Sequence, residues 1–368
     1  CKKVGYRKPP QTQPDMKMLD HRFCVAPMMD CSDRHDRYLL RLFSRHVVLY
    51  TEMVPVQALL NGDRSRFLNH DPVEHPVALQ LGGSDPLEMA DCAQLGEEAG
   101  FDEININVGC PSNRVQAGRF GVCLMLEPSR VAQCFQMMQD RVGVPVTVKC
   151  RIGVDQKDTF DDLRQFVEQL TVAGCRTFVV HARKAWLRGL SPRQNREVPP
   201  LRYELVYRLK DEFPELEIIV NGGIRFLAEV NRHLQFTDGV MVGREAYRNP
   251  SMLSGIDQVL FGSAAPQPAR WKVLELYKQH IQRELNRGTP LKQMTRHILG
   301  LFQGEPGARA WRRHLSCFAP VAGAGLEVID EAQSHLQRAI EGSASGAWES
   351  QAVNRNSGVI TVEGAPPQ

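Results

Sequence analysis

A cysteine in a turn is the residue of this chain best placed to do chemistry. Cys110 lies between Gly109 and Pro111, shortly after an apolar run that ends at Asn107. Gly109 lets the backbone approach a ligand closely, and Pro111 stiffens the turn. A lone cysteine is more often a buried structural residue, but polar and turn-forming neighbours surround this one. Free thiols have a pKa of about 8.5, so they act as acids at neutral pH, or as nucleophiles where a cation lowers that pKa. Both roles are open on the residues alone.

Two glycine-containing turns predict a site for a phosphate group. Asn221 opens an Asn-Gly-Gly turn that ends at Gly223, and Gly243 directly precedes Arg244. Each turn follows an apolar strand-like run, where backbone N–H groups bind phosphate and an arginine fork can assist. One such turn is more often a plain tight turn. The pair, with Lys149 available to face an electron-rich ring, suits a mononucleotide such as FMN.

A basic loop, residues 181–196, predicts contact with a polyanion. Cations surround Trp186 there, which is the composition of a nucleic-acid surface with a ring for stacking. A solvated lid over a small substrate is the alternative. The net charge of +3 hides an asymmetry, because residues 183–208 and 270–338 each carry five more basic than acidic residues. The second zone includes Trp311-Arg312-Arg313-His314, which predicts another basic patch with an aromatic residue.

Eight short apolar runs alternate with amphipathic stretches and are predicted to be strands. This alternation indicates an α/β protein with a parallel sheet, and the count matches a closed (β/α)8 TIM barrel. A doubly wound open sheet would carry a glycine-rich phosphate loop after its first strand, whereas Ala26, Pro27 and Met28 follow here. The strands are predicted at Phe23–Pro27, Val47–Glu52, Val77–Leu81, Glu103–Asn107, Val146–Cys150, Thr177–His181, Glu217–Asn221 and Gly239–Val242, with helices at Pro86–Ala99, Ser129–Asp140, Phe160–Ala173 and Arg202–Phe213.

Polar residues gather where the predicted strands end. The carboxyl ends of barrel strands all face one rim, and barrel enzymes build their active sites there. A single such residue would most often cap a strand, but several on different strands indicate a functional rim. These residues are Gln80, Asn107, Lys149, His181, Asn221 and the Gly243-Arg244 pair.

The chain is predicted to have four parts. A linker of small residues and proline runs from Gly262 to Pro268. Apolar residues then recur at helical spacing, which predicts a small C-terminal helical bundle. Small and polar residues dominate the end of the chain and predict a mobile tail. The parts are an N-terminal extension (1–19), the barrel (20–262), the helical domain (263–340) and the tail (341–368).

Composition favours a cytoplasmic protein without a membrane segment or a metal. No apolar stretch approaches the roughly 18 residues of a membrane helix, and the basic N-terminus lacks the apolar core of a secretory signal. The ten cysteines form no C-x-x-C pair, so we expect reduced thiols rather than zinc ligands or disulfides.

These motifs in combination resemble the tRNA-dihydrouridine synthases, over about residues 20–340. The segments that carry the resemblance are Ala26–Asp30, Asn107–Ser112, Gly118–Met125, His181–Arg183, Asn221–Gly223 and Val242–Arg244. The stretch His181–Pro200 resembles the A-type branch of the family, which modifies positions 20 and 20a of the tRNA D-loop. The resemblance implies an FMN-bearing barrel, a helical domain that grips tRNA, and NADPH as the reductant. It also implies a monomer whose Cys110 is the proton donor.

The resemblance further implies two groups of binding residues. Asn107, His181 and Arg183 would hold the uracil base, which must be flipped out to be reached. The residues implied for FMN are Pro27, Met28, Met29, Gln80, Lys149, His181, Asn221, Gly222, Gly223, Gly243 and Arg244. Those implied for tRNA are Asn107, Arg183, Lys184, Trp186, Arg188, Arg193 and Arg196.

Two alternatives remain at the level of sequence. An FMN barrel that reduces a small pyrimidine or enone would share the phosphate turns but leave the basic loops without a purpose. A catalytically idle RNA-binding protein would explain the basic loops but leave the rim residues and Cys110 unused.

Overall fold

The chain forms two compact units that divide between Pro268 and Ala269, at the end of the predicted linker. The computed structural model describes the backbone of residues 19–356 and the side chains of residues 19–342. The remainder of the N-terminal extension and residues 357–368 of the predicted tail lie outside the described residues.

The first unit is the predicted barrel. Each of its eight strands pairs in parallel with two neighbours, and the β1–β2 and β2–β4 pairs close the ring. The α/β prediction of a TIM barrel is therefore confirmed. The strands are β1 (Phe23–Val25), β2 (Val48–Tyr50), β4 (Val77–Gly82), β5 (Glu103–Val108), β6 (Val146–Arg151), β7 (Thr177–His181), β8 (Glu217–Asn221) and β9 (Gly239–Val242). A two-residue strand that the sequence pattern missed, β3 (Val54–Pro55), lies outside the ring beside β4.

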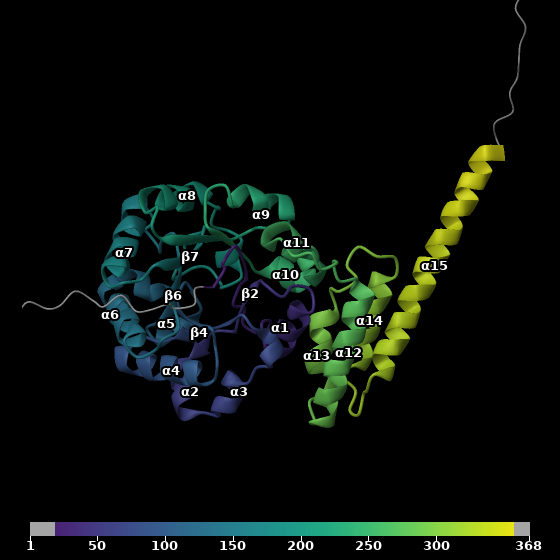
Figure 1. Cartoon of the computed structure of the whole chain (residues 1–368), viewed down its shortest axis with the longest axis horizontal. Coiled ribbons are helices and arrows are strands. Elements are labelled where there is room, and N and C mark those ends of the chain that lie inside the picture. The colour runs from purple at the N-terminus through teal and green to yellow at the C-terminus, as the bar shows by residue number, and fades with distance from the viewer. Residues whose placement is uncertain (1–18, 357–368) are drawn as a thin grey trace, which may run out of the picture. The chain divides into compact units, whose positions relative to one another are not determined.

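Helices cover the outside of the ring, as Figure 1 shows for α4, α6, α7, α8 and α9. Their starts carry capping residues: the Asp85 side chain accepts two backbone N–H groups at the start of α4, and Thr159 forms a capping box with Asp162 on α7. The helices are α1 (Arg34–Arg41), α2 (Val56–Asn61), α3 (Arg64–Leu68), α4 (Pro86–Glu98), α5 (Asn113–Ala117), α6 (Pro128–Gln139), α7 (Phe160–Val172), α8 (Tyr203–Glu212), α9 (Leu227–His233), α10 (Arg244–Arg248) and α11 (Ile256–Phe261).

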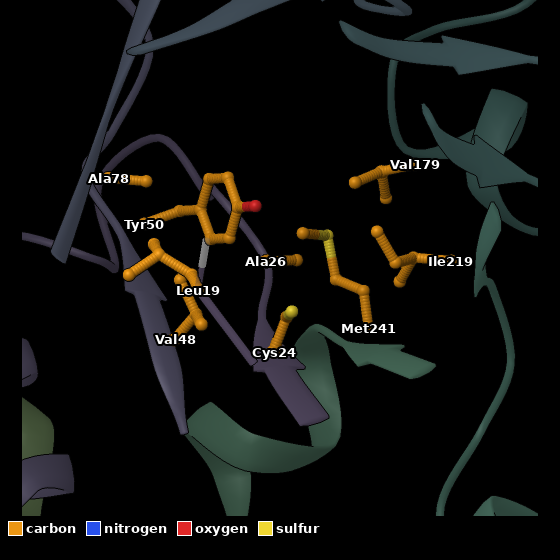
Figure 2. Packing of buried hydrophobic residues seen from close by; sticks show 9 residues of the cluster. All are labelled: Leu19, Cys24, Ala26, Val48, Tyr50, Ala78, Val179, Ile219 and Met241. Carbon is orange, nitrogen blue, oxygen red and sulfur yellow. The ribbon is translucent and has the colours of Figure 1, made fainter. Parts of the chain in front are cut away.

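The inside of the ring is filled by side chains rather than open. Apolar residues from β1, β2, β4, β7, β8 and β9 converge there (Figure 2). Since both faces of each strand are covered, the strands read as nearly continuous apolar runs. Leu19, which the sequence placed in the N-terminal extension, packs into this cluster.

The second unit is helical, with α12 (Arg270–Asn286), α13 (Leu291–Ile298), α14 (Ala308–Phe318) and α15 (Glu327–Asn356). The helix α15 continues to Asn356, so residues 341–356, predicted as tail, are helical in the structure.

The prediction of Trp311 as part of a surface patch is wrong. Its side chain is fully buried, its Nε1 donates to the Ile298 carbonyl oxygen at 2.9 Å, and its ring packs edge-on against Phe302. Trp311 lies on the apolar face of α14, while Arg313 beside it is exposed. An aromatic residue among cations is therefore a core residue here, because it lies on the buried face of an amphipathic helix.

Candidate active site at the carboxyl rim of the barrel

Strand register brings the predicted rim residues together. The β5–β6 pairing sets Asn107 opposite Lys149, and the β7–β8 pairing sets His181 opposite Asn221. Gln80 joins them from β4, with its side chain buried and bonded across to β5. Residues two apart on a strand point to the same side. Ala78, Val179 and Ile219 fill the barrel interior. The polar residues two positions after them therefore lie on the same side of their strands, nearer the rim.

Cys110 sits on a loop that three contacts hold in place. The Asn107 Oδ1 accepts the backbone N–H groups of Gly109 and Cys110 at 3.1 and 3.0 Å. The Cys110 carbonyl accepts the Val122 N–H at 3.0 Å. The thiol itself is partly exposed and lies 3.6 Å from the Ser112 hydroxyl. Hydrogen bonds thus fix the backbone of the loop, while its thiol stays partly exposed.

A second glycine makes this loop possible. Gly121 has a φ of +69°, and a Cβ added there would lie 2.6 Å from the Cys110 carbonyl oxygen. Gly121 begins a 3-10 turn, Gly121–Leu126. A side chain at position 121 would therefore push the Cys110 loop out of place.

Arg151 is a residue of the rim that the sequence pattern did not single out. Its buried side chain donates from Nε to the Gly109 carbonyl at 2.8 Å and from Nη1 to the Lys184 and Asn195 carbonyls, both at 3.1 Å. Burial lowers the pKa of Arg151 to about 10, so the guanidinium stays charged at neutral pH. Its position two residues after Lys149 on β6, facing the same side, is the signal that could have identified it.

Lys149 is a cation whose environment makes it easy to deprotonate. Its Nζ donates to the Asn221 Oδ1 at 3.1 Å, and the Asn221 amide donates to the Met241 carbonyl at 2.7 Å. Burial, and next the charge of Arg151, lower the pKa of Lys149 to about 8. The pKa of His181 is shifted in the same direction: burial and the charges of Arg151 and Lys149 hold it well below the usual range. His181 is consequently neutral at pH 7.

The Asn-Gly-Gly turn forms a tight cradle beside His181. Gly222 and Gly223 have φ values of +124° and +72°. A Cβ on Gly222 would lie 2.8 Å from the His181 ring, and one on Gly223 would lie 2.6 Å from Leu201. Side chains at these positions are excluded by space and by backbone conformation alike.

The segments after β1 and β9 meet at the same rim. A Cβ on Gly243 would be in ordinary contact with Ala26 and with the Met28 sulfur, at 3.5 and 3.6 Å. The Met29 side chain is half exposed, which is unusual for a large apolar residue beside a buried strand. The predicted Pro27–Met29 and Gly243–Arg244 segments therefore border one region.

The basic loop is internally organised rather than extended. Asn195, buried, accepts the Trp186 N–H at 2.7 Å and donates back to the Trp186 carbonyl at 3.0 Å. Lys184 pairs with Asp158 at 2.9 Å, and its Nζ lies 4.1 Å from the Trp186 ring centroid. Lys184 and Trp186 thus restrain each other, whereas Arg188 is exposed to solvent.

A group of arginines borders the rim with little opposing charge. Arg244 pairs with Glu197 at 2.6 Å, and Arg193, which is 80% exposed, approaches the same carboxylate at 3.7 Å. Arg183 donates to the Pro199 carbonyl, while its buried Nε has no partner. Arg196, exposed, completes the group. The resulting excess of positive charge favours an anionic ligand.

Within residues 19–342, no cluster of three His, Cys, Asp or Glu side chains is placed to hold a metal ion. The described cysteines are all free thiols. No helix in the part of the chain that the structure describes is long and apolar enough to cross a membrane.

A closed parallel barrel with polar groups from five strands gathered at its carboxyl rim has the architecture of a β/α-barrel enzyme. Residues 24–340 match the family model described as Dihydrouridine synthase (Dus). The chain belongs to this family, and it is accordingly an oxidoreductase.

Similar proteins match this chain over most of its length. A protein of Shewanella oneidensis is 54% identical over 323 residues, which cover 88% of this chain and 96% of that protein. One of Vibrio cholerae is 55% identical over 318 residues, 86% of this chain and 96% of its own length. One of Escherichia coli K12 is 54% identical over 312 residues, 84% and 90% of the two chains. Each of the three is named tRNA-dihydrouridine(20/20a) synthase.

Proposed function

We propose that this protein reduces the C5=C6 bond of uridine at positions 20 and 20a of the tRNA D-loop to dihydrouridine. The relatives named above carry that activity in their names. The observation that supports it best is the hydrogen-bonded Cys110 loop at the end of β5, on the same rim as Lys149, His181 and Asn221. The cytoplasm as its location and a monomeric state are part of the same proposal.

The rim residues fit FMN. Bound FMN would pass to C6 of the uracil ring a hydride that it obtains from NADPH. The cation-rich rim supplies Arg244 for the phosphate, and the Gly222–Gly223 turn, packed against His181 and Leu201, would offer backbone N–H groups at the end of β8. Lys149 would place a positive charge against the electron-rich ring. The full set proposed for FMN is Pro27, Met28, Met29, Gln80, Lys149, His181, Asn221, Gly222, Gly223, Gly243 and Arg244.

Cys110 would complete the reduction by protonation. After hydride addition at C6, negative charge spreads from C5 onto the neighbouring carbonyl, and the thiol proton is transferred to C5. Arg183 and neutral His181 would stabilise that carbonyl. Asn107 has one amide N–H left for the base, because its oxygen and its other N–H are used inside the protein.

The basic loop would hold the tRNA. Exposed Arg188, Arg193 and Arg196 are free to contact phosphates, which gives binding that weakens as salt rises. Trp186, held by Lys184, offers a ring on which a base can stack. Flipping the uridine out costs a few kcal/mol, which these contacts would offset.

The test is to incubate FMN-loaded protein with NADPH and dihydrouridine-free tRNA and to map dihydrouridine by position. Dihydrouridine at 20 or 20a that is lost in Cys110→Ala, with FMN retained, supports the reaction, the substrate and the proton donor. Cys31→Ala is the matched control, because Cys31 is also partly buried and is expected to be dispensable. Reduction of a free pyrimidine with every tRNA unchanged would overturn the proposal, as would tRNA binding without bound flavin.

A further inference from the structure

A chain of buried hydrogen bonds leads from the Cys110 loop to the far end of the barrel. The Asn107 amide donates to the Gln80 Oε1 at 2.7 Å, and the Gln80 amide donates to the Asn105 Oδ1 at 2.7 Å. The Asn105 amide donates to the Thr147 hydroxyl at 2.7 Å. Thr147 donates in turn to the Glu103 Oε1 at 2.5 Å. Every member is buried.

Every bond in this chain points the same way, and the last acceptor explains why. The Glu103 carboxylate oxygen is an acceptor, so Thr147 donates to Glu103 and accepts from its other neighbour. Asn105 must then turn its NH2 toward Thr147 and its oxygen toward Gln80. The same rule passes through Gln80 to Asn107, whose oxygen is left facing the two backbone N–H groups of the Cys110 loop.

Glu103, at the amino end of the barrel, accepts hydrogen bonds from three side chains. It opens β5, and it accepts from the Tyr50 hydroxyl at 2.8 Å and from His21 Nε2 at 2.6 Å. Figure 2 shows the Tyr50 hydroxyl directed into the barrel interior. His21 also contacts Glu217 through Nδ1 at 3.0 Å. Burial lowers the pKa of His21, but Glu103 and Glu217 outweigh it and raise the pKa to about 10. A protonated His21 donates from both ring nitrogens, which keeps each carboxylate an acceptor.

We propose that Glu103 is a positioning residue for Cys110, although it lies at the opposite end of β5. Its carboxylate sets the direction of the hydrogen-bond chain, and the chain keeps the Asn107 oxygen on the Cys110 loop. Reversal of the Asn107 amide would set its NH2 against two N–H donors and release the loop. The inference rests on the proposed function where activity is the readout.

The test interrupts the hydrogen-bond chain with a substitution at Thr147 and compares the effect with that of a substitution at Thr177. Thr147→Val removes the link between Asn105 and Glu103 without changing the side-chain shape much. Thr177 is the matched control, because its buried hydroxyl donates to Glu217 at 2.8 Å in the same ion-pair group but leads to no rim residue. Thr147→Ser restores the hydroxyl and is the rescue variant.

Two readouts are needed: the kinetics of tRNA reduction and the iodoacetamide alkylation rate of Cys110, followed by peptide mass spectrometry. For Thr147→Val we expect kcat to fall about tenfold or more, because a misplaced reacting group costs that much. We expect the KM for tRNA to be unchanged and alkylation to be several-fold faster, with Thr147→Ser and Thr177→Val close to wild type. Asn105→Ala, which removes the next donor, should repeat the Thr147→Val result.

Equal effects of Thr147→Val and Thr177→Val on both readouts would overturn the proposal, since the role would then be purely structural. An unchanged alkylation rate in both Thr147→Val and Asn105→Ala would overturn it as well. Alkylation is measurable in flavin-free protein, so the proposal stays testable for a variant that loads FMN poorly. If wild-type protein forms no dihydrouridine, the proposed function fails, while the alkylation comparison still decides this inference.

Discussion

Arg151 donates a hydrogen bond to the carbonyl oxygen of Gly109 at 2.8 Å, directly before Cys110 in the chain. The same guanidinium donates to three carbonyls of the basic loop, at Arg183, Lys184 and Asn195. One buried cation therefore joins the loop proposed to protonate the substrate to the loop proposed to hold tRNA. Since backbone carbonyls have no charge to neutralise it, the arginine also adds to the positive potential of the rim.

Replacing Arg151 with Met is expected to impair catalysis far more than folding. The variant loses the bonds to four backbone carbonyls and one charge, and we expect kcat/KM for tRNA to fall about 100-fold. Arg41→Met is the matched control: Arg41 is also buried and donates to backbone carbonyls, at Ser44, Val47, Glu74 and Pro76, but it contacts none of the rim residues named here. Both variants should lower the melting temperature. Equal activity loss in the two would contradict a role for Arg151 at the site.

The low pKa of Lys149 predicts pH-dependent FMN binding. With a pKa of about 8, the ammonium is mostly protonated at pH 7 and mostly neutral at pH 9. Because FMN is anionic, its affinity should fall as the pH rises across this range. Fluorescence titration of flavin-free protein with FMN at pH 6.5 to 9 measures the change, and Lys149→Met should bind weakly at every pH. Lys210→Met, which alters a lysine paired with Asp238, is the control. A pH-independent affinity in wild type would argue against contact between Lys149 and the ligand.

The barrel could be predicted from sequence because each strand is marked by a pattern within a few consecutive residues. Strands covered on both faces need continuous apolar runs, and polar residues at their ends mark the rim. The alternation therefore predicted all eight strands to within a few residues, and Lys149, His181 and Asn221 at the rim. The two-residue strand β3 was missed because it is too short to show a period of two.

The contacts inside the site could not be predicted, because they join residues far apart in the chain. In the sequence, Arg151 is only a charged residue at the end of a predicted strand, and the carbonyl of Asn195 that it contacts lies 44 positions further on. Glu103 reads as a polar residue at a strand start, and only the closed barrel brings it to His21. Trp311 was misread because the composition of a helix does not say which face packs inward.

Exposure in the basic loop predicts which cations set the salt dependence of tRNA binding. Arg188 and Arg193 are exposed, and replacing either with Gln should remove about one unit from the slope of log K against log salt. Lys184→Gln should instead disturb the loop itself, because Lys184 pairs with Asp158 and contacts Trp186. Filter binding at 50 to 300 mM KCl provides the slopes. Arg141→Gln, on the outside of the barrel, is the control and should leave the slope unchanged. Unaltered slopes for both loop arginines would place the tRNA elsewhere.

The buried group around His21 predicts that stability falls at alkaline pH. Glu103 and Glu217 raise the folded-state pKa of His21 to about 10, above its ordinary value of about 6.5. A raised pKa stabilises the fold fully below the unfolded value and loses that contribution as the pH rises through the folded value. The free energy of unfolding from urea melts should therefore drop by a few kcal/mol between pH 6.5 and pH 10. In His21→Gln this part of the pH dependence should vanish, leaving a less stable protein at pH 6.5. If the variant and the wild type lose stability in parallel over this range, another group is responsible.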